Sequence, residues 1–205
     1  MDASLYTRPT KPRTMTVKKR RGAPEVALPL PLPEIITVDT FTECHVTPPN
    51  VGKDMVDYLN DIRETGLTAE PQAGTGNLVQ ALFDAGLAAC DLIAVERHVG
   101  LCHSIEKRFI DESFKPVNDC FLEYAAREKG NILIPRIIMN PPFKNIKKHM
   151  SAALDLLGSD DGETAVLVAL VPITFNHPDA EMMEELPRET FSTVSISTKI
   201  IRIYR

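Results

Sequence analysis

The sequence contains no apolar stretch near the ~20 residues that a membrane-spanning helix requires, so no such helix is expected. It also lacks C-x-x-C pairs and the ligand spacing of zinc sites, although it has four cysteines, at positions 44, 90, 102 and 120. No internal repeat is visible. Prolines interrupt the apolar segment 26–32 after the basic N-terminus, which argues against a secretory signal. We therefore expect reduced thiols, no metal, and a cytoplasmic location of bacterial or phage type.

Charge is unevenly distributed along the 205 residues. Residues 1–24 carry seven Lys or Arg against one acid, so this segment has a net charge of +6; because the whole chain has −5, the remainder has −11. We expect a basic, Pro-rich flexible arm at residues 1–34 and one folded domain at residues 35–205. An acidic body is not the usual footprint of a nucleic-acid binder, so phosphate contacts would fall to the arm, if it is more than a solvated tail.

Strand and helix signals alternate along the folded part. Strands are expected at residues 67–71, 91–95, just before 119, 136–139 and 164–171, followed by a hairpin of residues 191–196 and 199–204. Helices are expected from 47, capped by Thr47 with Pro48 in the first turn, and at residues 77–85, 101–109 and 146–157. This alternation predicts an α/β, Rossmann-like, seven-stranded and mostly parallel sheet with helices on both faces and a C-terminal antiparallel hairpin.

The most informative motif is Asn140-Pro141-Pro142-Phe143, which directly follows the apolar run 136–139. A short β-branched run that stops at two prolines predicts a buried strand whose carboxyl end presents these four residues. Ligands bind at that end of the strands in open α/β sheets. An amide, two rigid prolines and an aromatic ring suit a site for a planar molecule with an amino group, although Asn-Pro also starts ordinary turns.

A second motif, residues 70–77, joins the first strand to its helix and contains two glycines that permit a sharp turn. Glu96 ends the next strand, where its carboxylate is placed to accept both hydroxyls of a ribose. A dinucleotide-binding loop would have a small residue at position 79, where this chain has Val79. Glu70 would repel phosphate but suits the amino group of an amino acid, and Asp119 adds an acceptor for an adenine amine. Together these features describe S-adenosylmethionine.

On these motifs the chain resembles class I S-adenosylmethionine-dependent methyltransferases, of the branch that modifies the amino group of adenine in nucleic acid. The matching pieces are segments 47–49, 70–77, 94–96, 118–119 and 140–143 and the hydrophobic strand before Pro172. The resemblance implies that the target is held by Asn140, Pro141, Pro142 and Phe143. It also implies that the cofactor is held by Thr47, Pro48, Glu70, Pro71, Ala73, Gly74, Thr75, Gly76, Asn77, Glu96, Asp119 and Asn140.

The implied reaction is methyl transfer to the exocyclic amino group of adenine in DNA. An RNA amino methyltransferase, a protein-glutamine methyltransferase and a non-catalytic cofactor-binding module remain as alternatives. The chain has little room for a separate recognition domain, since only about 20 residues separate Phe143 from the fifth strand. We therefore expect one of three outcomes: the chain recognises little sequence, recognition comes from a partner or a homodimer, or recognition comes from the basic residues 18–21 and the loop 176–189.

Overall fold

The computed structural model describes residues 46–59, 66–160, 162, 164–190 and 196–205, and the backbone of strands β1 (Arg13–Val17) and β2 (Glu34–Val38). These two strands pair antiparallel. The boundary expected at residue 34 falls at the start of β2 and stays a prediction. The basic residues 18–21 lie outside the described residues. Within the described ranges, no helix is long and apolar enough to cross a membrane.

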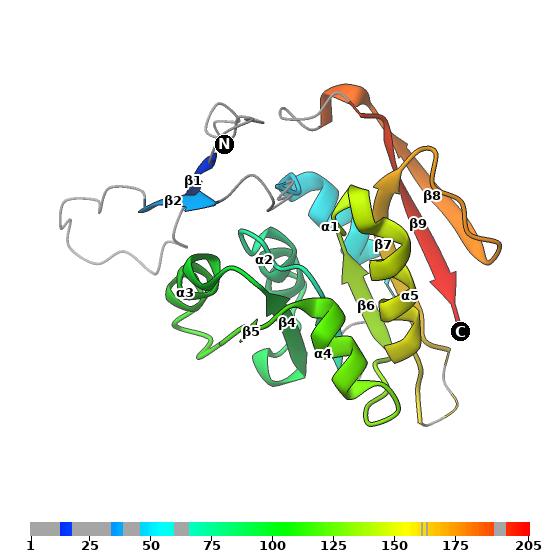
Figure 1. The fold of residues 1–205 in the computed structure, drawn as a ribbon, viewed down its shortest axis with the longest axis horizontal. Helices are drawn as coiled ribbons and strands as arrows, with labels where there is room; N and C mark the ends of the chain where they lie inside the picture. The colour runs from blue at the N-terminus through cyan, green and yellow to red at the C-terminus, as the bar shows by residue number, and fades with distance from the viewer. Residues whose placement is uncertain are drawn as a thin grey trace.

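Seven strands form one mixed sheet in the order β5-β4-β3-β6-β7-β9-β8 (Figure 1). Their bounds are Thr68–Glu70 (β3), Leu92–Glu96 (β4), Val117–Asn118 (β5), Arg136–Met139 (β6), Val166–Pro172 (β7), Ala180–Leu186 (β8) and Thr198–Tyr204 (β9). The strands β5, β4, β3, β6 and β7 pair parallel, whereas β9 pairs antiparallel with both β7 and β8. This topology confirms the predicted fold class.

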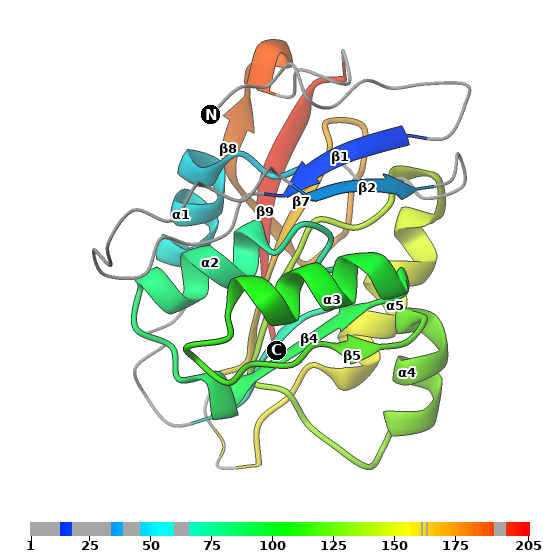
Figure 2. The same cartoon turned by 90° about the vertical axis from the view of Figure 1, so that its left-hand side faces the viewer.

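The helices cover both faces of the sheet. They are Pro49–Asp57 (α1), Asn77–Asp84 (α2), Val99–Arg108 (α3), Phe121–Glu128 (α4) and Ile146–Leu156 (α5), with 3-10 turns Ala89–Asp91 (η2), Phe143–Asn145 (η3) and Arg188–Thr190 (η4). Figure 2 shows α1 and α2 on one side of the sheet and α4 and α5 on the other.

The core divides accordingly, because successive side chains of a strand point to opposite faces. Ile138 in β6 packs in the cluster with α1 and α2. Its neighbours Ile137 and Met139 pack in the cluster with α4 and α5.

The strand order creates a ligand crevice. From β3 the chain proceeds to β4 and β5 on one side, and then returns to β6 on the other side of β3. The loops that leave β3 and β6 therefore diverge, and a cleft opens between them at the carboxyl ends of the strands. Both predicted motifs, residues 70–77 and 140–143, begin at this switch point.

Two elements differ from the sequence prediction. Helix α4 was not predicted, although Phe121, Tyr124 and Ala125 have helical spacing and are buried. The first strand of the terminal hairpin was expected at residues 191–196, of which 191–195 lie outside the described residues; the strand that the structure pairs with β9 is β8, within the segment expected to be a loop. The sequence does not predict this strand, because it is a Glu-rich edge strand whose residues are mostly exposed or half-buried. A bulge between Met182 and Glu184 also interrupts the alternation of buried and exposed side chains that is typical of strands.

Candidate functional site

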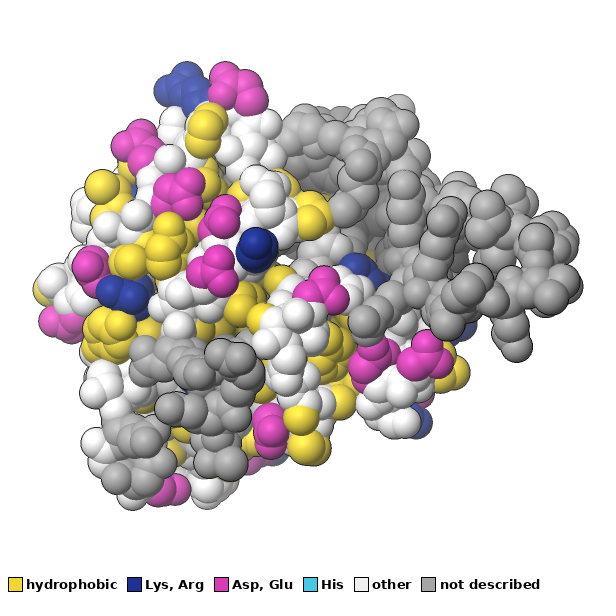
Figure 3. Space-filling view, turned by 180° about the vertical axis from the view of Figure 1, so that it is seen from behind, with side chains coloured by type: hydrophobic (Ala, Val, Ile, Leu, Met, Phe, Trp, Pro, Cys, Tyr) yellow, Lys and Arg dark blue, Asp and Glu magenta, His cyan; other side chains and the backbone are white. Residues whose placement is uncertain are grey.

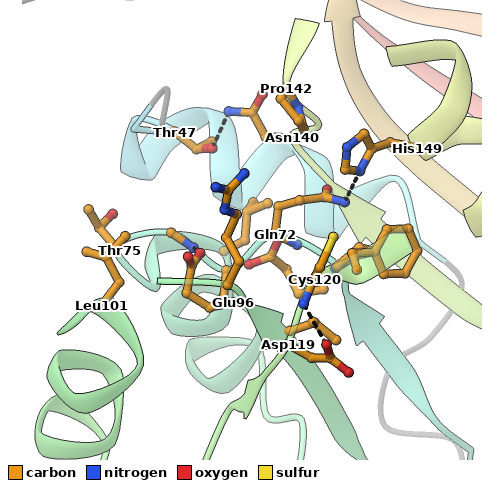
Figure 4. A pocket seen from close by; sticks show the side chains of 18 of the residues that line it. Thr47, Gln72, Thr75, Glu96, Leu101, Asp119, Cys120, Asn140, Pro142 and His149 are labelled. Carbon is orange, nitrogen blue, oxygen red and sulfur yellow. Dashed lines mark hydrogen bonds between the residues drawn. The ribbon is translucent and has the colours of Figure 1, made fainter. Parts of the chain in front are cut away.

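The two motifs meet in a cavity of ≈ 330 Å³ at the carboxyl ends of β3, β4, β5 and β6 (Figure 4). Of the residues predicted to form the site, those that line it are Thr47, Glu70, Pro71, Ala73, Gly74, Thr75, Asn77, Glu96, Asp119, Asn140 and Pro142. Pro48, Gly76, Pro141 and Phe143 do not line it. Pro141 is buried beside the cavity wall, and Phe143 starts η3 with its side chain half-buried.

The glycine loop is held in shape from two sides. The Gly74 amide donates to Glu96 Oε2 at 2.8 Å, and the other carboxylate oxygen, Oε1, accepts from the His98 amide at 2.7 Å. From α3, the Arg108 guanidinium donates to the Thr75 carbonyl at 2.9 Å and to Asn77 Oδ1 at 3.1 Å. The loop is therefore tied to β4 and α3 before any ligand binds.

Gly76 has a packing role rather than the expected position in the cavity wall. Its φ is +78°, a conformation that favours glycine, and a Cβ atom there would lie 3.1 Å from Phe109 Cε2 and 3.3 Å from Ile105 Cγ1. The glycine thus lets α3 approach the loop closely. The sequence motif located the turn correctly but could not show which side of it faces the cavity.

The Gly76→Ala variant should lose about 2–4 kcal/mol of unfolding free energy, because it combines backbone strain with overpacking against Phe109. Urea unfolding measures the loss. Gly130→Ala is the matched control. Gly130 has φ +80°, but apart from its chain neighbours a Cβ atom there would meet nothing within 4 Å, so only backbone strain of about 1 kcal/mol remains. Equal losses in the two variants would contradict the packing role.

Glu70 is a buried carboxyl group at the floor of the cavity. Its side chain is 1% exposed, and Oε1 accepts from the Gln72 amide at 3.2 Å. Its second oxygen, Oε2, is buried and has no hydrogen-bond partner among the described residues. Burial, together with the nearby Glu96, raises the pKa of Glu70 to about 8, although the hydrogen bond from the Gln72 amide opposes that shift. An acceptor without a donor in a ligand cavity marks a place for a cationic or hydrogen-bonding ligand group.

Glu96 is also buried, and burial raises its pKa, although the backbone amides of His98 and Gly74 oppose that shift. Asp119, predicted as an acceptor for an adenine amine, already has two partners. Its Oδ1 accepts from the Cys120 amide at 2.7 Å, and its Oδ2 pairs with Arg127 of α4 at 2.9 Å. Each carboxylate oxygen can accept a second hydrogen bond, so these contacts orient both groups without exhausting them.

Thr47 differs from the prediction. The helix α1 begins at Pro49 with Pro48 at the N-cap and no side-chain cap, so Thr47 is not the capping residue. Instead, Thr47 Oγ1 accepts from Asn140 Nδ2 at 3.0 Å, and the Thr47 carbonyl accepts from Asn77 Nδ2 at 2.8 Å. Thr47 therefore connects the glycine loop with the Asn-Pro-Pro-Phe motif. Local sequence rules cannot show a contact between residues 93 positions apart.

Several residues of the cavity wall were not predicted. Gln72 and His149 are the polar pair among them: Gln72 Nε2 lies 3.0 Å from His149 Nδ1. His149 comes from the first turn of α5 and stacks on Phe121. The others are Val46, Leu78, Val95, Arg97, Leu101, Cys120, Phe121, Leu122, Lys144 and Asn145. Within the described ranges, no three His, Cys, Asp or Glu side chains gather as a metal site would require.

Solved structures provide the comparison, since neither protein-family profiles nor characterised proteins match this sequence. A candidate methyltransferase from Escherichia coli, yhhF, superposes with a TM-score of 0.56 at 11% identity, covering 75% of this chain and 82% of its own. The chain has the class I methyltransferase fold. A candidate RNA methyltransferase from Pyrococcus horikoshii, PH1948, has a TM-score of 0.54 at 17% identity, with 79% and 86% coverage.

The same fold also occurs as part of a larger protein. The methyltransferase subunit of a type I restriction-modification system from Streptococcus thermophilus has a TM-score of 0.60 at 16% identity. The match covers 77% of this chain but 44% of that subunit. At these identities the likeness shows the fold alone, and the chemistry depends on the residues of the cavity.

Proposed function

We propose that the protein is an S-adenosylmethionine-dependent methyltransferase that modifies the exocyclic amino group of adenine in DNA. One observation supports this proposal: the buried carboxyl group of Glu70 and the amide of Asn140, at the end of a strand, line the same cavity. The first suits a cationic amino acid, and the second suits a target amine. They lie at the carboxyl ends of adjacent strands, β3 and β6.

The residues present fit the cofactor. Oε2 of Glu70, which has no donor among the described residues, is placed to accept from the amino group of the methionine part. Glu96 keeps acceptor capacity for ribose hydroxyls beyond its bonds to Gly74 and His98. Asp119 and Phe121 line the region proposed for the adenine ring. When bound, S-adenosylmethionine supplies a methyl group on a positively charged sulfur.

The motif residues act on the target amine, whose lone pair is delocalised into the ring. Thr47 holds Asn140 through Nδ2, which orients the opposite end of the amide, Oδ1, as the proposed acceptor for one hydrogen of the amine. The Pro141 carbonyl is proposed to accept the other hydrogen. Two such bonds draw the nitrogen toward a tetrahedral form, and they strengthen as positive charge develops on it. Phe143 is proposed to stack on the base once it has flipped out of the duplex.

DNA recognition requires positively charged side chains. On the face of the molecule that Figure 3 shows, the acidic side chains of the described residues outnumber Lys and Arg. The basic residues of segment 1–24, a recognition partner or a second copy of the chain would supply the phosphate contacts. A small catalytic domain can act on DNA in this way, because the phosphate contacts are made outside it.

A methyl-transfer assay with labelled cofactor, offering DNA, RNA and protein side by side, tests the function. We expect label in DNA, recovered as N6-methyladenine after hydrolysis. Label in structured RNA alone or on protein glutamine would identify one of the other acceptors. Cofactor binding without transfer to any acceptor would indicate a binding module.

A further inference from the structure

His149 occupies an unusual position in the cavity. It is 9% exposed, although it lines the wall, and two contacts fix its ring: Nδ1 lies 3.0 Å from Gln72 Nε2, and the ring stacks on Phe121 with centroids 6.1 Å apart and planes 20° apart. In the view of Figure 4, His149 lies with Asn140 and Pro142 at one end of the cavity, away from Asp119 and Glu96. A held, buried imidazole therefore lies at the end proposed for the target.

Methylation of an amine requires a proton acceptor, and the motif residues do not provide one. The nitrogen becomes cationic and must lose a proton, but amide and peptide oxygens, such as those of Asn140 and Pro141, are not bases near neutral pH. Among the described residues of the wall, the other ionisable side chains are Glu70, Glu96, Asp119, Cys120, Lys144 and Arg97.

These other groups are less suited to receive the proton. Glu70 is proposed to pair with the cofactor, Glu96 accepts from two backbone amides, and Asp119 pairs with Arg127. Lysine and arginine side chains, such as those of Lys144 and Arg97, are hydrogen-bond donors without an acceptor, and a cysteine sulfur, such as that of Cys120, is a weak acceptor. His149 alone combines a basic lone pair with a place at the target end.

We propose that His149 accepts the proton released by the target nitrogen, an inference that rests on the proposed function. The nitrogen lone pair forms a bond to the methyl carbon while the bond between that carbon and sulfur breaks, and its electron pair stays on sulfur. One N–H bond of the resulting ammonium then breaks. Its electrons return to nitrogen, and the proton moves to Nε2 of His149, which becomes an imidazolium and later releases the proton to solvent.

Gln72 sets which ring nitrogen carries the proton. With Gln72 Nε2 donating to Nδ1, the neutral ring would carry its proton on Nε2. The proposed role therefore uses the other orientation of the amide, in which Oε1 accepts from Nδ1–H and the lone pair of the neutral ring lies on Nε2. Oε1 is buried and has no partner among the described residues, and its bond to Nδ1–H is kept when the ring becomes an imidazolium.

The surroundings keep the ring neutral before the reaction. Burial lowers the pKa of His149 from its ordinary value. The ionisable groups on the elements around it are Glu70 before the glycine loop, Cys120 at the N-cap of α4, Lys144 on η3, those of α4 (Glu123, Tyr124, Arg127 and Glu128) and those of α5 (Lys147, Lys148 and Asp155).

A pH–rate profile under single-turnover conditions, with the cofactor saturating at every pH, tests the proposal, with His149→Gln as the variant and His103→Gln, at an exposed position of α3, as the matched control. We expect the wild-type rate to fall on acidification below about pH 6.5, and His149→Gln to be about 100-fold slower at pH 7.5 without that acid limb. Cofactor affinity, measured by calorimetry, should change less than twofold. NMR titration of the His149 ring in the unmodified protein should give a pKa that coincides with the acid limb.

The outcomes separate the two proposals. Wild-type protein that transfers no methyl group to DNA, RNA or protein overturns both. An active wild-type protein whose His149→Gln variant keeps its rate and its acid limb overturns the role of His149 alone. So does a pKa of the His149 ring that differs from the acid limb by more than one unit, a measurement that does not depend on any variant folding.

Discussion

Replacing Asn140 with alanine should reduce methyl transfer by at least about 100-fold while leaving cofactor affinity nearly unchanged. Removing one preorganised group that stabilises developing charge typically costs 10²–10³ in rate. Asn140 is held by Thr47 at the end of β6, whereas the carboxylates proposed for the cofactor, Glu70 and Glu96, end β3 and β4. The rate is measured with labelled cofactor and the affinity by calorimetry.

Asn131→Ala is the control for this experiment, since Asn131 is an exposed residue after α4 whose amide donates to the Arg127 carbonyl. It should leave both quantities unchanged. Thr47→Val adds a second comparison, because it removes the acceptor that orients the Asn140 amide and should give a smaller loss of rate. Parallel loss of rate and cofactor affinity in Asn140→Ala would show that Asn140 serves binding rather than the transfer step.

Replacing Glu70 with glutamine should have opposite effects on binding and on stability. Cofactor affinity at pH 8 should fall by about 100-fold or more, because the partner of a buried cationic group is removed. Stability should rise instead. The pKa of Glu70 is about 8 in the folded protein, against an ordinary 4.5, so ionisation of the buried carboxyl opposes folding. That penalty begins above pH 4.5, grows with pH and is complete above about pH 8, where it reaches at most about 5 kcal/mol.

The pH dependence provides the measurement. The gain in unfolding free energy of Glu70→Gln over the unmodified protein should be small at pH 5 and largest near pH 8.5. Cofactor affinity of the unmodified protein should increase as pH rises from 6 to 8, since binding requires the carboxylate, and the variant should lack this increase. Glu123→Gln, at an exposed position of α4, is the control. A variant that binds the cofactor with undiminished affinity would exclude the proposed pairing.

The sequence predicted those parts of the fold whose signals are local. The bounds of β6 coincide with the predicted strand at residues 136–139, because the run is short, contains two β-branched residues and is ended by two prolines, which together favour a strand. The edge strand β8 was misplaced, because its Glu-rich residues face solvent and its pairing with β9 depends on distant residues.

The same distinction applies to the site. Glu70, Gly74, Glu96 and Asn140 were recognised because each lies in a motif at the end of a strand, and the structure brings all four to one cavity. Gln72 and His149 were missed, since their pairing joins a loop and a helix 77 residues apart. The position of Gly76 away from the cavity depends on the packing of α3, which no local pattern encodes.

The bonds of Glu96 and Arg108 to the glycine loop have a consequence for the energetics of ligand capture. The Glu96 carboxylate from β4 and the Arg108 guanidinium from α3 already hold the loop, so it loses little conformational entropy when a ligand binds. Most of the free energy of the ligand contacts then contributes to affinity, because little of it is offset by ordering the chain. Ligand-free and ligand-bound forms should consequently overlay closely at residues 73–77.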